Sequence, residues 1–211
     1  MEKKIARIIE LLDKEYPKAK GSLRFANPLE LLVSTILSAQ CTDARVNMVT
    51  QQLFKKYKNV MDYAKADSRL FEQDIHSTGF YRNKAKNIIA AAQMIVQEFA
   101  GKVPETMQEL ISLPGVARKT ANIVLYGAFG KIEGIAVDTH VSRLSQRLGL
   151  SGHKDPVKIE QDLMDKVDRS DWGRINYLLV EHGRHVCDAK KPQCLKCVLA
   201  KQCPSKKIFF S

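Results

Sequence analysis

Apolar residues in this chain recur at helical spacing, and no stretch alternates apolar and polar residues long enough to predict a strand. A first apolar stripe, near the N-terminus, predicts an amphipathic helix, and its members are Ile5, Ile8, Ile9 and Leu12. A second stripe predicts a longer helix, and its members are Ile88, Ala92, Ile95 and Phe99. Gly101 follows the second stripe and is expected to end that helix.

Capping signals predict where most other helices begin. Asn27-Pro28-Leu29-Glu30 combines an N-cap, a proline and an acid, and predicts a helix over residues 31–37. Thr106 and Glu109 form a capping box for a short helix that reaches Leu113. Further helix starts are expected at Thr42 or Asp43, at Asp67 or Ser68, at Asp155, and at Ser170 or Asp171. Residues 133–137 are too few to predict a strand, so the expected fold class is all-α.

The composition is that of a basic globular protein. A chain of 211 residues can form one large or two small domains, and 45% hydrophobic residues is ordinary for such domains. Its 34 Lys and Arg against 23 Asp and Glu give a net charge of +11, which favours a nucleic-acid partner over a merely well-solvated surface. We find no signal-peptide pattern and no run of about 18 apolar residues. No membrane partner is therefore expected. An unpaired cysteine together with the metal site described next favours a reducing cytoplasm, with association to the nucleoid if the protein is prokaryotic.

Four cysteines near the C-terminus have the spacing of metal ligands. They are Cys187, Cys194, Cys197 and Cys203, in the pattern C-x6-C-x2-C-x5-C. This spacing favours a metal site over disulfides. A single CxxC with a more distant cysteine on each side favours a [4Fe–4S] cluster, with zinc as the alternative. Cys41 lies outside the pattern and is expected to be a free thiol.

The segment LPGVARKTA, residues 113–121, predicts a tight turn between two helices. Pro114 and Gly115 allow the turn, and the start of the second helix offers backbone N–H groups and a positive dipole end to a phosphate. Lys119 stands at this helix start beside Arg118. An isolated turn of this kind would indicate only a plain connection between helices. Here the short acidic motif VDTH, residues 137–140, follows in the sequence.

These motifs together resemble the endonuclease III family of DNA glycosylases. LPGVARKTA resembles its helix-hairpin-helix, VDTH its catalytic-aspartate motif, and the four cysteines its cluster loop. LSAQCTD, residues 37–43, resembles another family segment near the DNA gap. The resemblance implies two all-α domains that face each other across a DNA-binding cleft. A six-helix domain would cover roughly residues 22–132, and a cluster domain would combine residues 1–21 and 133–211.

The resemblance also implies a function. The protein would be a monomeric DNA glycosylase and AP lyase with a [4Fe–4S] cofactor, acting on duplex DNA that contains oxidised pyrimidines or abasic sites. Lys119 would be the nucleophile that attacks C1′ and forms a Schiff base with the sugar. Asp138 would activate Lys119 and stabilise positive charge on the sugar. An N-cap at Asp138 is a compatible structural role.

Other positions are implied to contact DNA. Gln40 would fill the hole left by the flipped base, unless it is only a polar residue at a helix end. Phe80 stands where the family commonly has a leucine that wedges the opposite strand, unless it belongs to the core. The remaining implied DNA contacts are Asp43, Gly115, Ala117, Arg118, His140, Arg184, Lys190 and Lys191.

Several of these contacts have structural alternatives. Asp43 could instead cap a helix or pair with a cation, His140 could be structural, and the two lysines could be merely solvated. Arg184 could contact either phosphate or the surroundings of the cluster. Ala117 replaces the glycine usual in the family hairpin, which leaves the geometry of the turn open.

Two other functions compete with this one. The first is an adenine-mismatch glycosylase of the same superfamily, but such enzymes generally lack a lysine at position 119 and carry an additional C-terminal domain. The second is a DNA-binding or damage-sensing module that keeps the cluster without catalysis. Strand cleavage would distinguish the module from an enzyme.

Overall fold

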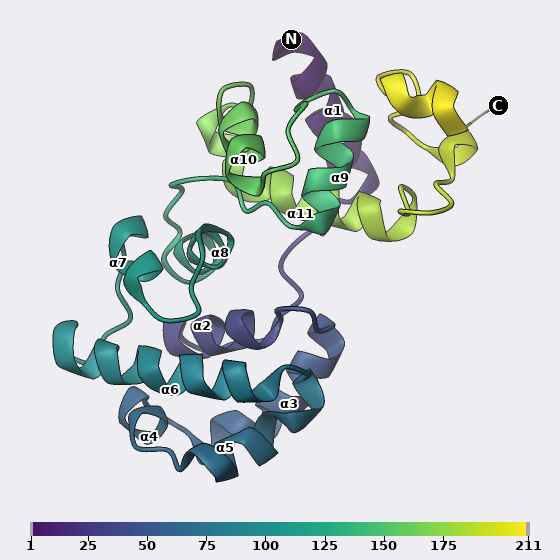
Figure 1. Cartoon of the computed structure of the whole chain (residues 1–211). Coiled ribbons are helices and arrows are strands. Elements are labelled where there is room, and N and C mark those ends of the chain that lie inside the picture. Colours follow the sequence, from purple (N-terminus) through teal and green to yellow (C-terminus); the bar gives the residue numbers. More distant parts are fainter. Residues whose placement is uncertain (1, 210–211) are drawn as a thin grey trace. The chain divides into compact units, whose positions relative to one another are not determined.

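The computed structural model describes residues 2–209 (Figure 1). Every regular element within these residues is a helix, so the all-α prediction is confirmed. The chain forms two compact units, Ser22–Lys131 in one and Met1–Gly21 with Ile132–Ser211 in the other. Among the helices of the described residues, none is long and apolar enough to cross a membrane.

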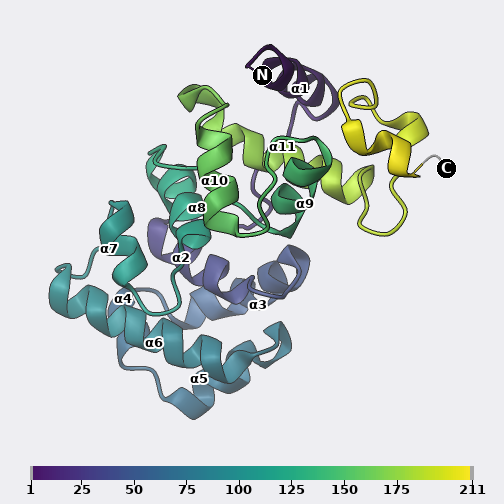
Figure 2. The same ribbon diagram turned by 45° about the horizontal axis from the view of Figure 1, so that its top comes forward.

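The unit Ser22–Lys131 has a hydrophobic core to which several helices contribute. Its helices are α2 (Pro28–Leu37), α3 (Asp43–Lys56), α4 (Val60–Ala64), α5 (Ser68–Ile75), η1 (His76–Thr78), α6 (Tyr81–Glu98), α7 (Met107–Ser112) and α8 (Arg118–Phe129). Residues 31–37 of α2 are all buried, including the polar Ser34 and Thr35. α2 packs against α8, and α6 packs against α4 and α5 (Figure 2).

The second unit joins the beginning of the chain to its C-terminal part. Its helices are α1 (Glu2–Glu15), α9 (Thr139–Arg147), α10 (Pro156–Met164), η2 (Arg169–Asp171), α11 (Trp172–His185), η3 (Cys194–Lys196) and η4 (Pro204–Phe209). α11 packs against both α1 and α9, and α10 packs against α9. The predicted N-terminal stripe is buried in this core, with its four members at most 7% exposed.

Most predicted helix starts are confirmed by their caps. Asn27, Thr42, Asp67, Thr106 and Asp155 each accept a backbone N–H from the first turn of the helix that follows. The helix after Asp67 ends at Ile75, where a 3-10 turn takes over. The short helix α4 was not predicted, because its single turn contains no apolar periodicity.

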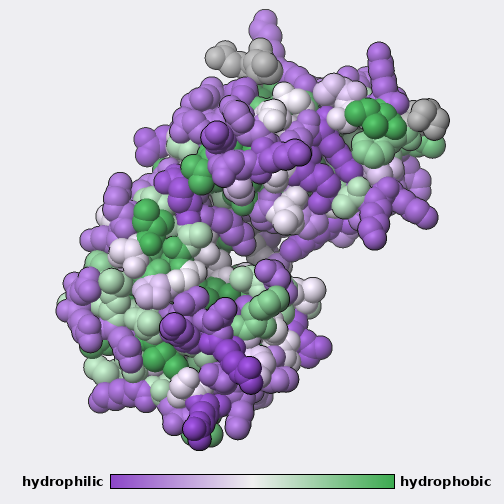
Figure 3. Space-filling model, in the orientation of Figure 1, coloured by the Kyte–Doolittle hydropathy of each residue, from purple (hydrophilic) through white to green (hydrophobic). Residues whose placement is uncertain are grey.

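Hydrophilic residues cover most of the face shown in Figure 3, and hydrophobic residues occur there in scattered groups. The most exposed large apolar side chains of the described residues are Leu195 and Ile208, at 87% and 70%. A polar surface with a strong positive charge suits an anionic partner better than an apolar one.

Candidate functional site

The turn between α7 and α8 is closed by tight backbone packing. Gly115 has φ +79, and a Cβ at this position would lie 2.8 Å from the Cβ of Asn87. The N–H of Val116 donates to the carbonyl of Leu113 at 3.1 Å. Ala117 has φ −96, a conformation that any residue adopts, so its methyl group fits the turn without strain. The structure thus requires glycine at position 115 but not at position 117.

Helix α8 begins at Arg118 without a side-chain cap. The positive dipole end of this helix favours a bound anion. Lys119 is the second residue of the helix and is half-buried, as is Arg118. Both cations therefore stand at the positive dipole end of a 12-residue helix, and phosphate binding there stays a prediction.

Two of the expected DNA contacts adopt a left-handed backbone conformation, which non-glycine residues rarely do. Gln40 has φ +53 and Phe80 has φ +48. Phe80 is 64% exposed, so the alternative that it belongs to the core is wrong. Gln40 is also exposed, in the connection between α2 and α3. Strained residues of this kind concentrate at functional sites.

Asp43 has a structural role in the first turn of α3. Its carboxylate accepts a hydrogen bond from the hydroxyl of Ser22. Asn47, one turn later, accepts the N–H of Arg24 at 2.9 Å and donates to the carbonyl of Ser22 at 2.8 Å. Together Asp43 and Asn47 fasten residues 22–24 to α3. A direct contact between Asp43 and DNA stays a prediction.

Asp138 is the N-cap of α9. Its Oδ1 accepts the N–H of Val141 at 2.8 Å, and the residue is half-buried. The segment before it is buried, and the amide of Asn176 donates to the carbonyl of Ala136 at 2.6 Å. The predicted cap is confirmed, and the carboxylate is held on a well-fixed backbone. Its catalytic role stays a prediction.

His140 lies in a packed cluster at the start of α9. Its Nδ1 is 3.1 Å from Nη2 of Arg143, which also donates to the carbonyl of Gly183 at 3.0 Å. The ring of His140 is thus enclosed by Arg143 and the backbone of Gly183. Burial lowers the pKa of His140. These contacts support the structural alternative for His140.

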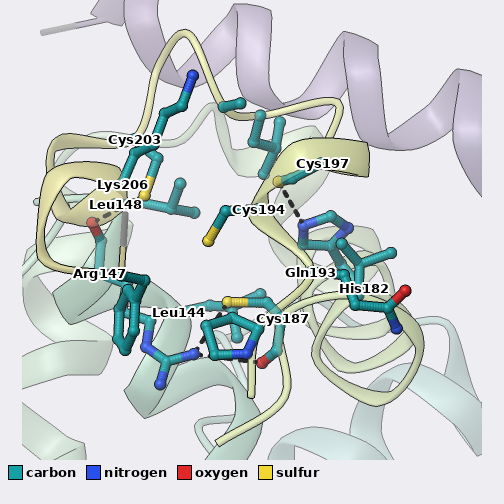
Figure 4. Close-up of a pocket in the computed structure, with 15 residues that line it drawn as sticks. Leu144, Arg147, Leu148, His182, Cys187, Gln193, Cys194, Cys197, Cys203 and Lys206 are labelled. Atoms are coloured by element: carbon teal, nitrogen blue, oxygen red, sulfur yellow. Dashed lines mark hydrogen bonds between the residues drawn. The ribbon is translucent and has the colours of Figure 1, made fainter. Parts of the chain in front are cut away.

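The four cysteines predicted to bind metal line one pocket (Figure 4). Its space between atoms is about 440 Å³, part of it open to solvent. Cys187, Cys194, Cys197 and Cys203 are all free and half-buried. Within residues 2–209, no three His, Cys, Asp or Glu side chains stand close enough to hold a single metal ion. The sulfurs thus surround a space wider than one ion.

Two arginines of α9, which the sequence analysis missed, fasten the first segment of the cysteine loop. Arg147 donates to the carbonyls of Asp188 and Ala189 at 2.7 and 2.8 Å, and its Nη1 is 3.3 Å from the sulfur of Cys187. Arg143 donates to the carbonyl of Cys187 at 3.0 Å. The helix capped by Asp138 is therefore bonded directly to the cysteine loop.

A buried histidine lies on another side of the pocket. Nε2 of His182 is 3.3 Å from the sulfur of Cys197, and its Nδ1 is 3.1 Å from the hydroxyl of Tyr16. Burial lowers the pKa of His182 to about 4 and raises the pKa of Cys197 to about 11. A thiolate at Cys197 therefore requires stabilisation, such as a metal centre provides.

Two exposed lysines follow the first cysteine of the loop. The carboxylate of Asp188 accepts the N–H groups of Lys190 and Lys191 at 2.8 and 3.0 Å, which shapes this turn. Arg184, at the end of α11, has Nη1 3.5 Å from a carboxylate oxygen of Glu181. The predicted roles of these three cations toward phosphate stay predictions.

This chain is similar to known base excision DNA repair proteins. Residues 33–169 match the model of the HhH-GPD superfamily base excision DNA repair proteins. The chain is 55% identical over 198 residues to endonuclease III of Synechocystis sp., which covers 94% of this chain and 90% of the relative. It is 46% identical over 202 residues to endonuclease III of Bacillus subtilis, which covers 95% of this chain and 92% of that relative.

A solved structure of a trapped endonuclease III–DNA covalent intermediate is also similar. Its TM-score is 0.95 at 42% identity, over 100% of this chain and 99% of that one. These matches confirm the resemblance seen in the motifs, and the chain belongs to the endonuclease III family within the HhH-GPD superfamily of base excision DNA repair proteins.

Proposed function

We propose that the protein excises oxidised pyrimidines from duplex DNA and then cuts the strand 3′ to the resulting abasic site. Its family membership makes it a base excision repair glycosylase with lyase activity. The oxidised-pyrimidine substrate and the roles of single residues are our extension of that assignment.

The position of Lys119 is the observation that carries the proposal. Lys119 lies in the first turn of α8, directly after the hairpin turn, where the helix start has no side-chain cap. A phosphate bound at this helix start would bring the adjoining sugar close to the lysine amine. A lysine amine is a nucleophile that forms Schiff bases. The relative with 42% identity has been trapped as a covalent intermediate with DNA.

The reaction begins when the damaged base leaves the stack, at a cost of a few kcal/mol. Gln40 fills the vacated space, where its amide can both donate to and accept from the orphaned partner base. The exposed ring of Phe80 wedges the step in the opposite strand. Both side chains project from the surface of the unit Ser22–Lys131.

Lys119 and Asp138 carry the chemical steps. The neutral amine of Lys119 attacks C1′, the bond to the base breaks, and the lysine becomes a Schiff base to the opened sugar. The ionised Asp138 carboxylate stabilises the positive charge that develops on the sugar as the base leaves, and it then accepts the proton that the attached Lys119 nitrogen loses. Water or the departed base takes a proton from C2′, and the C3′–O3′ bond breaks so that the 3′ phosphate leaves with its electron pair. Hydrolysis of the Schiff base then frees Lys119. Arg118, the backbone of Gly115 and Ala117, Arg184, Lys190 and Lys191 hold phosphates.

We also propose that the four cysteines bind a [4Fe–4S] cluster. Four free thiols line one pocket, and four thiolates are the ligands that such a cluster takes. A cubane holds its ligand sulfurs farther apart than a single ion does, which is compatible with the wide spacing here. When bound, the cluster fixes the fold of residues 187–203 and takes no part in bond cleavage.

The first experiment tests the metal centre. Protein isolated without oxygen is expected to be yellow-brown and to contain about four irons per chain. Cys194→Ser should lower the iron content, because it removes a ligand. Cys41→Ser should leave the iron content unchanged, since Cys41 belongs to the unit Ser22–Lys131. Iron and zinc analysis with absorbance spectra measures both, and colourless folded protein with stoichiometric zinc would contradict the cluster.

The second experiment tests the substrate. A duplex with one thymine glycol should lose the base and acquire a nick at that position, whereas an undamaged duplex should stay intact. Base release and strand cleavage are measured separately on the same duplex. Excision of adenine from a mismatch in place of thymine glycol would favour the adenine-mismatch alternative. Binding without cleavage of any duplex would favour a non-catalytic module.

A further inference from the structure

A buried lysine near the start of α6 bonds to two separate stretches of chain. Lys84 is only 5% exposed. Its Nζ donates to the carbonyl of Leu37 at 2.7 Å and to the carbonyl of Thr78 at 2.8 Å. Lysine is almost never so deeply buried unless it is paired, because a buried charge without partners is costly. The hydrogen bonds to the two carbonyls therefore compensate for burying the ammonium group of Lys84.

Each carbonyl lies just before a residue proposed to enter the DNA. Leu37 ends α2, and Gln40 follows three residues later. Thr78 ends η1, and Phe80 follows two residues later. Lys84 thus bonds to the residue before each of two connections, residues 38–42 between α2 and α3 and residues 79–80 between η1 and α6. The two connections are far apart in the sequence.

Both connections contain strained backbone. Gln40 and Phe80 have φ +53 and +48, conformations that are unfavourable for residues other than glycine. They persist only where surrounding contacts determine the backbone. The N–H of Cys41 donates to the carbonyl of Ser38 at 3.1 Å within the first connection. The N–H of Lys84 itself donates to the carbonyl of Phe80 at 3.1 Å.

We propose that Lys84 is a positioning residue that sets the geometry of Gln40 relative to Phe80, so that both side chains enter DNA at the same lesion. The inference rests on the proposed roles of Gln40 and Phe80. Lys84 itself is buried and touches no substrate. Without its ammonium group, two buried carbonyls lose their donor and the two connections can relax independently.

The main test replaces Lys84 by methionine, which keeps the long side chain and removes the donor. Single-turnover excision of thymine glycol should fall by about 10²-fold, since an error of about 1 Å in positioning has effects of this size. Cleavage at a preformed abasic site should fall far less, because no base must leave the stack. Lys166→Met is the matched control, since Nζ of Lys166 also donates to a carbonyl, that of Leu150 at 2.9 Å, in the other unit.

A second measurement does not depend on activity. Hydrogen exchange of the free Lys84→Met protein should speed up at both connections, residues 38–42 and 79–80, while exchange in α8 stays as in the native protein. Lys84→Gln retains a donor for one carbonyl but is too short to bridge two, so it should give an intermediate result. It also provides a test where Lys84→Met does not fold.

The outcomes separate this inference from the proposed function. Equal losses on thymine glycol and abasic duplexes, together with faster exchange throughout the unit, would indicate a general structural role and overturn the inference. Unchanged excision and unchanged exchange would also overturn it. If the native protein excises no damaged pyrimidine, the proposed function fails, and the exchange measurement still decides whether Lys84 holds the two connections together.

Discussion

Lys119→Ala is expected to abolish the covalent adduct that borohydride traps between the protein and an abasic-site duplex. The amine is the only group proposed to bond to C1′, so no Schiff base can form without it. Strand cleavage should fall by on the order of 10⁴-fold or more, as for other removed nucleophiles. Duplex binding should persist, because the phosphate contacts proposed at the start of α8 involve backbone groups and Arg118. Denaturing gels measure the adduct, and fluorescence anisotropy measures binding.

Lys119→Arg provides the matched control for charge. Arginine keeps the positive charge but is never deprotonated in proteins, so it cannot attack C1′. This variant should bind duplex as the native protein does and still form no adduct. An adduct of native yield in Lys119→Ala would remove Lys119 from its assigned role. Loss of binding together with the adduct would indicate that Lys119 contacts phosphate instead.

Local signals predicted most helices because capping is a short-range interaction. Asn27, Thr42 and Asp155 each bond to an N–H within the first turn that follows, so the sequence pattern and the contact coincide. The start of α11 differs, since Asp171 occupies the N-cap position without making a side-chain cap bond. The short helix α4 has its own capping box at Asn59, but its five residues are too few to show an apolar period.

The residues that hold the site together could not be predicted in this way. Arg147 bonds to the carbonyl of Asp188, 41 residues away, and Lys84 bonds to the carbonyl of Leu37, 47 residues away. In sequence both are ordinary cations on helices, and only folding shows that their partners are carbonyls. The exposure of Phe80 could not be predicted either, because a left-handed backbone at a non-glycine residue leaves no sequence signal.

Asp138→Asn is expected to lower single-turnover base excision by about 10²- to 10⁴-fold, the usual contribution of a general acid or base. Asparagine cannot accept the proton of Lys119 and carries no charge to stabilise the sugar. It is as good an N-cap as aspartate, so its amide oxygen can still accept the N–H of Val141. The melting temperature should therefore stay close to the native value. Excision kinetics and thermal unfolding of the same preparations measure the two effects.

Asp138→Ala separates the cap from the chemistry, because alanine removes both. Its excision rate should match that of Asp138→Asn, while its stability should fall by about 0.5–2 kcal/mol from loss of the cap. The helix concerned, α9, also supplies Arg143 and Arg147 to the cysteine loop, so iron content should be measured in both variants. If Asp138→Asn excises at the native rate and only Asp138→Ala is impaired, Asp138 is a cap alone. The proton acceptor for Lys119 must then be sought elsewhere.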